Sequence, residues 1–244
     1  LSKEEGVEYS FKLGYCYLQL NDKKEALNAF YEIKDEPSNY YDPSNYYYAH
    51  LNYEVGKYQA ALESFTRIEQ QDGFSDIVPY YIVHIYHMQK KYDELIEYAQ
   101  PLLKTYEAEK KDEIERLLGE AFYHKKDYKG ALPYLENYAK GKGEQTPESN
   151  YQLGYCYMQT KDYKNAVTYF NFVSTEDNAL GQTANYHLGN MYVQLDNKTF
   201  ARNAFRAAAK LPYKPGLKED AMYNYAKLAY ELSYNPYHEA ISAF

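Results

Sequence analysis

Three histidines come closest to a metal-binding pattern in this sequence. His84 and His87 are three positions apart, so both imidazoles would lie on one face of a helix, and His50 precedes His84 by 34 positions. Zinc and similar ions are held by imidazole nitrogens together with Cys thiolates or carboxylates. The only cysteines, Cys16 and Cys156, are not near these histidines in the sequence. Two imidazoles without a metal-binding motif do not make a site, so we predict no metal and no cofactor.

The carboxylates indicate no catalysis either. Glu113, Glu115 and Glu120 have the ordinary spacing of charged residues on a helix surface, and we identify no paired acid and base among them. The sequence contains no Gly-rich phosphate loop, no nucleophile elbow and no zinc signature. We therefore predict that the chain is not an enzyme and has no catalytic residues.

Charge and hydropathy exclude two further classes of partner. The formal net charge is −8 without a cluster of Lys and Arg, which argues against a nucleic-acid groove. No apolar run approaches the roughly 20 residues that span a bilayer, so we predict no direct insertion into a membrane. What remains is a protein or peptide partner.

Tyrosine is the residue type best suited to that kind of chemistry here. The chain has 34 tyrosines in 244 residues and no tryptophan. A phenol ring offers a large apolar face and one polar hydroxyl, so it serves in cores and at wet interfaces alike. The question is then which elements position these rings.

A grid of small and aromatic residues defines those elements. Gly154, Tyr157, Ala166 and Phe170 are spaced by three, nine and four positions, and the same grid recurs around Gly14 and around Gly189. The small residue recurs along the whole chain at steps of 34 to 37 positions, at Gly14, Ala49, Val83, Gly119, Gly154, Gly189 and Ala226. Glycine in a helix costs about 1 kcal/mol relative to Ala, so we infer that it permits a close helix–helix approach.

This pattern resembles the tetratricopeptide repeat, a helix–turn–helix unit of about 34 residues, and we expect a bacterial array of this kind. The resemblance implies an all-α fold: an α-solenoid, wound as a right-handed superhelix, of about seven units with the last one truncated. We expect one solenoid domain over residues 1–244, part of a longer protein, with repeats at about 7–41, 42–75, 76–111, 112–146, 147–181, 182–218 and 219–244. Pro37 and Pro43 predict an extended connector from Asp35 to Asn45.

In the family, the first helices of successive repeats line a concave groove. Carrying the groove positions over to this sequence gives mostly aromatic rings and imidazoles. The predicted groove residues are Phe11, Tyr15, Tyr46, His50, Tyr53, Tyr80, His84, His87, Tyr151, Tyr155, Tyr186 and Tyr223. The resemblance therefore implies a non-enzymatic scaffold that binds a polypeptide segment in a Tyr/His-rich groove.

Two alternatives stay open. The rings could instead pack between neighbouring first helices. The array could also be a structural or assembly module of a larger, cell-envelope or multidomain, protein that self-associates through residues 220–244. As to the ligand, some members of the family clamp a peptide carboxylate with Lys and Asn, and this sequence has Phe11, Tyr15 and His50 at such positions. An extended or helical segment with apolar, aromatic or Pro side chains is therefore expected, with a sugar as the weaker choice.

Overall fold

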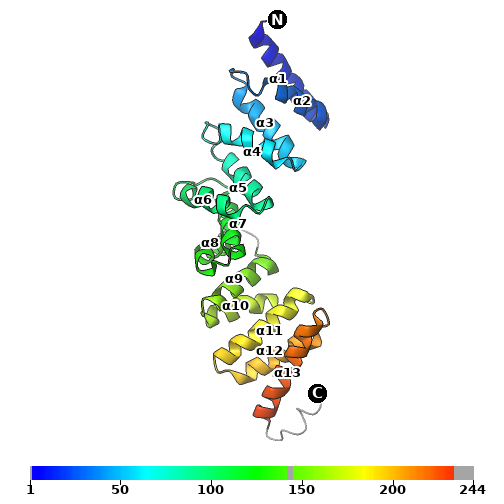
Figure 1. Ribbon diagram of the computed structural model, residues 1–244, viewed down its shortest axis with the longest axis vertical. Helices are drawn as coiled ribbons and strands as arrows, with labels where there is room; N and C mark the ends of the chain where they lie inside the picture. The colour runs from blue at the N-terminus through cyan, green and yellow to red at the C-terminus, as the bar shows by residue number, and fades with distance from the viewer. Residues whose placement is uncertain (1, 142–144, 234–244) are drawn as a thin grey trace. The chain divides into compact units, whose positions relative to one another are not determined.

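The structure is a computed structural model that describes residues 2–141 and 145–233. In these residues it contains thirteen α-helices and no strand, as the repeat pattern predicts (Figure 1). The chain forms two compact units, residues 1–118 and residues 119–244, and the division falls inside helix α7. The second helix predicted for the seventh repeat lies outside the described residues, and the prediction of a single domain stays a prediction.

The first unit consists of three helix pairs and the beginning of a fourth. Its helices are α1 (Lys3–Gln19), α2 (Lys23–Ile33), α3 (Tyr41–Glu54), α4 (Tyr58–Ile68), α5 (Val78–Met88), α6 (Tyr92–Leu102) and the first part of α7 (Lys111–His124). Each helix from α1 to α5 packs against the next one along the chain. Serial stacking of this kind is how repeat proteins build a core without a single globular centre.

The second unit continues the same pattern. It contains the rest of α7 and helices α8 (Tyr128–Lys140), α9 (Pro147–Gln159), α10 (Tyr163–Val173), α11 (Ala179–Gln194), α12 (Lys198–Lys210) and α13 (Pro215–Leu232). Consecutive helices from α8 to α13 pack against one another, and α11 also contacts α9 and α13. First helices of neighbouring repeats therefore meet directly in this unit.

The turn inside each repeat has one recurring conformation. Its residue before the helix cap has a positive φ between 54° and 74°, and six repeats place Asn21, Gly56, Lys90, Lys126, Lys161 and Asp196 there. The next residue caps the second helix. Asp22, for example, accepts a hydrogen bond from the N–H of Glu25, and Asp162 does the same for Asn165. Only Gly56 takes this left-handed conformation without steric cost.

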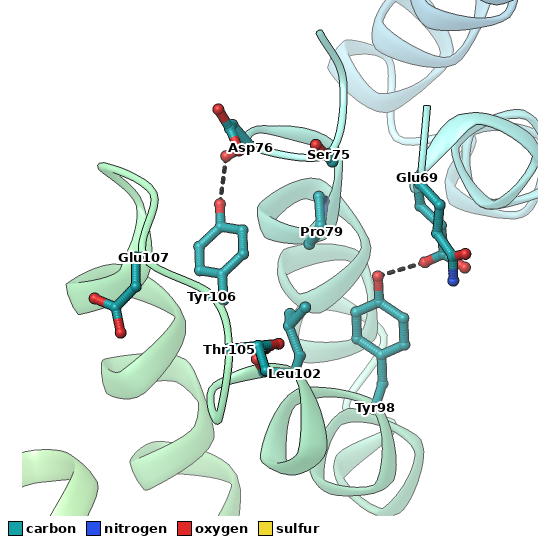
Figure 2. A pocket seen from close by; sticks show the side chains of 10 residues that line it. Glu69, Ser75, Asp76, Pro79, Tyr98, Leu102, Thr105, Tyr106 and Glu107 are labelled. Atoms are coloured by element: carbon teal, nitrogen blue, oxygen red, sulfur yellow. Dashed lines mark hydrogen bonds between the residues drawn. The ribbon is translucent and has the colours of Figure 1, made fainter. Parts of the chain in front are cut away.

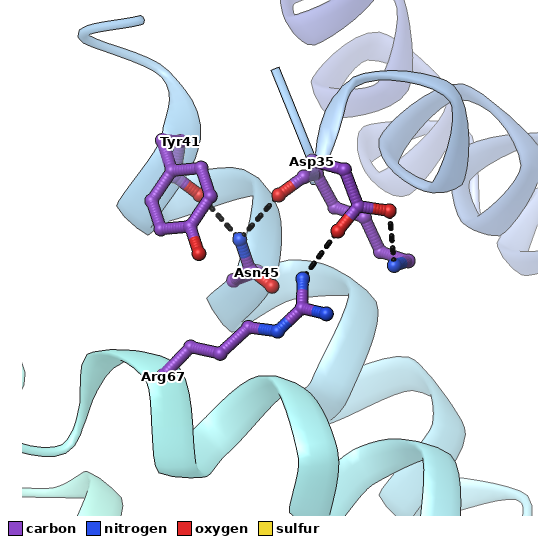
Figure 3. Close-up of polar contacts among 5 residues, drawn as sticks. Asp35, Tyr41, Asn45 and Arg67 are labelled. Atoms are coloured by element: carbon purple, nitrogen blue, oxygen red, sulfur yellow. Dashed lines mark hydrogen bonds and ion pairs between the residues drawn. The ribbon is translucent and has the colours of Figure 1, made fainter. Parts of the chain in front are cut away.

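The predicted extended connector from Asp35 to Asn45 is wrong at its end. Helix α3 begins at Tyr41, because Pro43 falls in its first turn, where the N–H that proline lacks has no intrahelical partner. The buried amide of Asn45 donates to the carbonyl oxygens of Lys34 (2.6 Å) and Tyr41 (3.0 Å) and so ties the connector to the helix (Figure 3).

The side chains beside this connector are paired as well. Asp35 pairs with Arg67 of α4 and with Lys34 at 2.7 Å (Figure 3). In the second unit Asn185 repeats the role of Asn45, donating to the carbonyl of Ser174 at 2.8 Å. The two connectors are thus held by the same amide contact, four repeats apart.

The glycine of the grid lies against the phenylalanine of the same repeat. The ring of Phe170, on α10, lies directly against Gly154, on α9, and a Cβ placed on Gly154 would be 3.0 Å from the ring. The corresponding distance is 2.9 Å for Gly14 and Phe30, and 2.6 Å for Gly189 and Phe205. These three phenylalanines are almost fully buried. A side chain larger than hydrogen at the glycine would therefore push the ring out of place.

Replacing Gly154 by Leu tests this contact. We expect Gly154→Leu to destabilise the protein by about 1–3 kcal/mol, because the added side chain occupies the space of the Phe170 ring. Gly6→Leu is the matched control, since a Cβ on Gly6 meets nothing within 4 Å. Urea unfolding followed by circular dichroism measures both. Equal stability of the two variants would contradict the close-contact role of the glycine.

Candidate interaction surfaces

Four of the predicted groove residues contact the buried phenylalanine of their own repeat edge-on. The ring pairs, with centroid distances, are Phe11–Phe30 (5.7 Å), Tyr46–Phe65 (6.2 Å), Tyr151–Phe170 (5.6 Å) and Tyr186–Phe205 (5.6 Å). Their interplanar angles, from 61° to 69°, are those of favourable edge-to-face pairs. All four rings are half-buried. Part of each ring therefore packs inside its repeat.

The residue after three predicted groove residues, Tyr46, Tyr80 and Tyr186, was missed by the sequence analysis. Tyr47 stacks on Phe30 at 5.1 Å, Tyr81 on Phe65 at 5.0 Å and His187 on Phe170 at 5.2 Å. In each pair the stacked ring comes from the first helix of the following repeat. The signal was present in the sequence as an adjacent aromatic pair, Tyr46-Tyr47, Tyr80-Tyr81 and Tyr186-His187.

In the first unit, six rings from α3 and α5 form what we name the Tyr53 cluster. Its members are Tyr46, His50, Tyr53, Tyr80, Tyr81 and His84. The Tyr53 hydroxyl lies 3.0 Å from Nδ1 of His84, and its ring is 5.1 Å from that of Tyr81. Every member is half-buried. The structure thus brings five predicted groove residues together and adds Tyr81.

Burial shifts the pKa values of two polar groups in this cluster. It raises the pKa of Tyr53 to about 12, with neighbouring Tyr80 adding to the effect. It also lowers the pKa of His84, and the nearby His87 lowers it further. The phenol therefore stays protonated and the imidazole is mostly neutral near pH 7, so both offer uncharged donors and acceptors.

The edge of the Tyr53 cluster already holds a cation. The ammonium of Lys110 lies 5.5 Å from the centroid of the Tyr80 ring, within the range of a cation–π contact. Tyr80 also contacts His84 at 5.8 Å. The half-buried ring of Tyr80, beside Lys110 and His84, is therefore suited to contacts with apolar groups and backbone amides as well as with cations.

In the second unit, five rings form what we name the Tyr155 cluster. Its members are Tyr123, Tyr128, Tyr151, Tyr155 and His187, and all are half-buried. Tyr155 is 5.5 Å from Tyr128, 5.8 Å from Tyr123 and 6.1 Å from Tyr151. The Tyr151 hydroxyl lies 3.2 Å from Nε2 of His187. The hydroxyl–imidazole contact between first helices of neighbouring repeats thus recurs in both units.

The remaining predicted groove residues lie outside the two clusters. Tyr15 is 44% exposed and contacts Tyr47, and His87 is half-buried beside Tyr92. Tyr223, on α13, is 62% exposed. Some of the predicted rings therefore pack between neighbouring first helices, and every predicted residue keeps some exposed surface. Their place on a concave face stays a prediction.

Over 2–141 and 145–233, no three His, Cys, Asp or Glu side chains are arranged to hold a metal ion. None of the helices in these ranges combines the length and apolar character of a membrane span.

Comparisons with known proteins agree with this architecture. Family models described as tetratricopeptide repeat match residues 8–38 and residues 147–171. The chain is built of tetratricopeptide repeats. No curated protein sequence matches it.

Solved structures show the same tetratricopeptide fold at low identity. YrrB, described as a tetratricopeptide protein with an unusual peptide-binding site, has 21% identity and a TM-score of 0.64, over 80% of this chain and 98% of YrrB. A repeat protein from Parabacteroides merdae has 15% identity and a TM-score of 0.57, over 98% and 99% of the two chains. MamA from Desulfovibrio magneticus has 16% identity and a TM-score of 0.56, over 69% and 93%.

His187 gives a test of the packing in the second unit. Burial, and secondarily the charge of Lys214, lower the pKa of His187 to about 4, below the ordinary value near 6.5. The folded state then binds fewer protons than the unfolded state between these values. The titration of His187 does not reduce the free energy of unfolding above about pH 6.5. Below that value it lowers the free energy of unfolding as pH drops toward 4, by at most about 1.4 kcal/mol per pH unit.

Urea unfolding at several pH values between about 7 and 5 measures this loss. The control is His187→Phe, which keeps a ring on Phe170 and removes the titration. Wild type should lose more stability than the variant as pH falls. Parallel pH profiles would show that His187 titrates normally in the folded protein.

Proposed function

We propose that this repeat array is a non-enzymatic scaffold that binds a polypeptide segment through the Tyr53 and Tyr155 clusters. The observation that carries the proposal is the repeated design of the two surfaces. Each combines several half-buried tyrosines with a hydroxyl–imidazole contact between neighbouring first helices. A tetratricopeptide fold supports a role in protein–protein interaction, and the two clusters supply its chemistry.

Preorganisation of the rings favours binding at these clusters. A tyrosine held by ring contacts on several sides loses little side-chain freedom when a segment docks on it. Tyr155 has such contacts with Tyr123, Tyr128 and Tyr151. Because the entropy of ordering is a main cost of binding, fixed rings convert more of their contact area into affinity. Tyrosine is also among the residues that dominate measured interface energies.

The polar groups favour a peptide ligand. The hydroxyl–imidazole pairs offer uncharged hydrogen-bonding groups, which suit peptide N–H and C=O groups. Apolar or aromatic side chains of the segment would cover the exposed ring surfaces. YrrB, the similar structure described with an unusual peptide-binding site, adds support for this choice of ligand.

The test replaces one anchor in each cluster. Tyr80→Ala and Tyr155→Ala remove rings that have no contact with a buried phenylalanine, whereas Tyr151 and Tyr186 have such a contact and their loss would open the core. Peptides selected on the wild-type protein from a random display library serve as probes. We expect each variant to lose about fivefold or more in affinity for the peptides that use its cluster.

Tyr9→Ala is the matched control, because Tyr9 is 62% exposed on α1 and belongs to neither cluster. Circular dichroism melting verifies that all three variants fold. If peptides bind both cluster variants as tightly as wild type, the proposed surfaces are not the binding site.

A second candidate function, assembly by self-association, rests on α13. This helix exposes Tyr223 (62%), Tyr230 (56%) and Leu232 (38%). Static light scattering of wild type and of Tyr223→Ser/Tyr230→Ser tests it. A mass above the monomer in wild type that falls in the double variant favours assembly, since loss of two exposed rings weakens an apolar contact. A monomeric wild type at all concentrations contradicts it.

A further inference from the structure

A hollow of about 490 Å³ lies in the first unit, and its lining includes no member of the Tyr53 cluster (Figure 2). Its walls come from the end of α6, the beginning of α5, and the connectors 69–77 and 103–110. These are the two longest connectors between helices of the described chain. The volume lies within the range of about 300–1,000 Å³ that is usual for ligand sites.

Two tyrosines hold the walls together. The hydroxyl of Tyr98, on α6, donates to the carboxylate of Glu69, one residue after α4. The hydroxyl of Tyr106, on the second connector, donates to the backbone carbonyl of Asp76, on the first (Figure 2). Tyr106 is only 7% exposed. These bonds join elements about 30 positions apart in the sequence, so the hollow is a built feature of the packed repeats.

The lining is acidic at the rim and apolar in the middle. Glu69, Asp76 and Glu107 line it, and its described lining includes no Lys or Arg. Outside the lining, Lys111 pairs with the exposed carboxylate of Glu107 at 2.7 Å. Figure 2 shows Leu102 and its neighbour Pro79 between the two tyrosine rings. The hollow thus combines apolar side chains, two tyrosines and three carboxylates.

We propose that this hollow binds the side chain of a Lys or Arg residue on a partner polypeptide. The aliphatic stem of such a side chain packs on Leu102 and Pro79, as long basic side chains commonly do on apolar surfaces. Its cationic head is attracted by the carboxylates of Glu69, Asp76 and Glu107, which line the hollow, and the half-buried ring of Tyr98 offers a π face to it. The ligand class follows from this charge complementarity.

A bare metal ion fits the hollow less well. A metal site needs several oxygen ligands converging within about 2–2.6 Å of one point. Within the described ranges, no three carboxylate, imidazole or thiolate groups are arranged in this way. Glu69 already accepts the hydroxyl of Tyr98, and Glu107 pairs with Lys111. A long basic side chain fills the space and places its charge near the carboxylates, so it fits the hollow without any rearrangement of the lining.

This inference does not depend on the proposed function of the aromatic clusters, because the hollow shares no residue with them. If the protein binds peptides only through the clusters, substitutions in the hollow will not change peptide binding. A chain that binds only basic side chains here would respond to changes in the hollow and not to Tyr80→Ala or Tyr155→Ala.

The experiment uses Nα-acetyl-arginine N-methylamide as a probe, with the neutral citrulline analogue as its partner. Titration of the whole 15N-labelled chain at low ionic strength, followed by two-dimensional NMR, locates the binding. We expect the arginine probe to shift the amide signals of Ser75, Asp76, Thr105 and Glu107, and the citrulline probe to leave them in place. Equal shifts from both probes, or arginine shifts spread over all acidic surfaces, would overturn the proposal, as would no shift at all.

Two variants test the charges. Glu69→Gln keeps an oxygen that accepts the Tyr98 hydroxyl, and Asp76→Asn leaves the backbone carbonyl that Tyr106 uses. We expect each to weaken the arginine probe about two- to fivefold, as for exposed ion pairs, and the double variant more. The control Glu63→Gln removes an exposed charge elsewhere on α4. Unchanged probe affinity in the double variant, with an otherwise intact spectrum, would also overturn the proposal.

Discussion

The structure depends on the enclosure of one phenylalanine ring in each of several repeats. Phe170 shows the full arrangement: Gly154 lies against it, Tyr151 meets it edge-on, and His187 of the next repeat stacks on it. The glycine and the edge-on ring join the two helices of one repeat, and the stacked ring joins that repeat to the next. Each aromatic pair adds about 0.5–1.5 kcal/mol beyond the burial of its area. One contact set therefore holds the repeat together and sets its place in the stack.

This enclosure explains why rings that serve the core also reach the surface. Tyr46 and Tyr151 use one edge against a buried phenylalanine, and both remain half-buried. A phenol is long enough to pack at its base and still present its far side. Packing and recognition are therefore not competing explanations for these residues. The same contact that stabilises the repeat fixes the orientation of the ring that a partner would meet.

Local and periodic features were predictable from the sequence, and long-range ones were not. The spacing of Gly154, Ala166 and Phe170 predicts the helix pair, because small residues permit a close approach of two helices, but it did not predict that Phe170 is the residue against Gly154. The start of α3 was misjudged, since Pro43 reads as a helix breaker unless its place in the first turn is known. Tyr81 was missed because it follows the groove residue Tyr80 and is not itself at one of the family's groove positions. The hollow beside Tyr98 joins connectors about 30 positions apart, which no local pattern reveals.

The turns within the repeats have a consequence for how the protein can change. Five of the six recurring turn positions carry a side chain, such as Lys90 or Lys161, in a backbone conformation that L-residues adopt at a cost of about 1–2 kcal/mol. Gly56, in the second repeat, takes the same conformation without that cost. Replacement of these five residues by Gly would remove that backbone strain at positions that belong neither to the core nor to the proposed surfaces. The stability gained in this way would offset the cost of destabilising substitutions elsewhere, so the residues of the aromatic surfaces can change without unfolding the array.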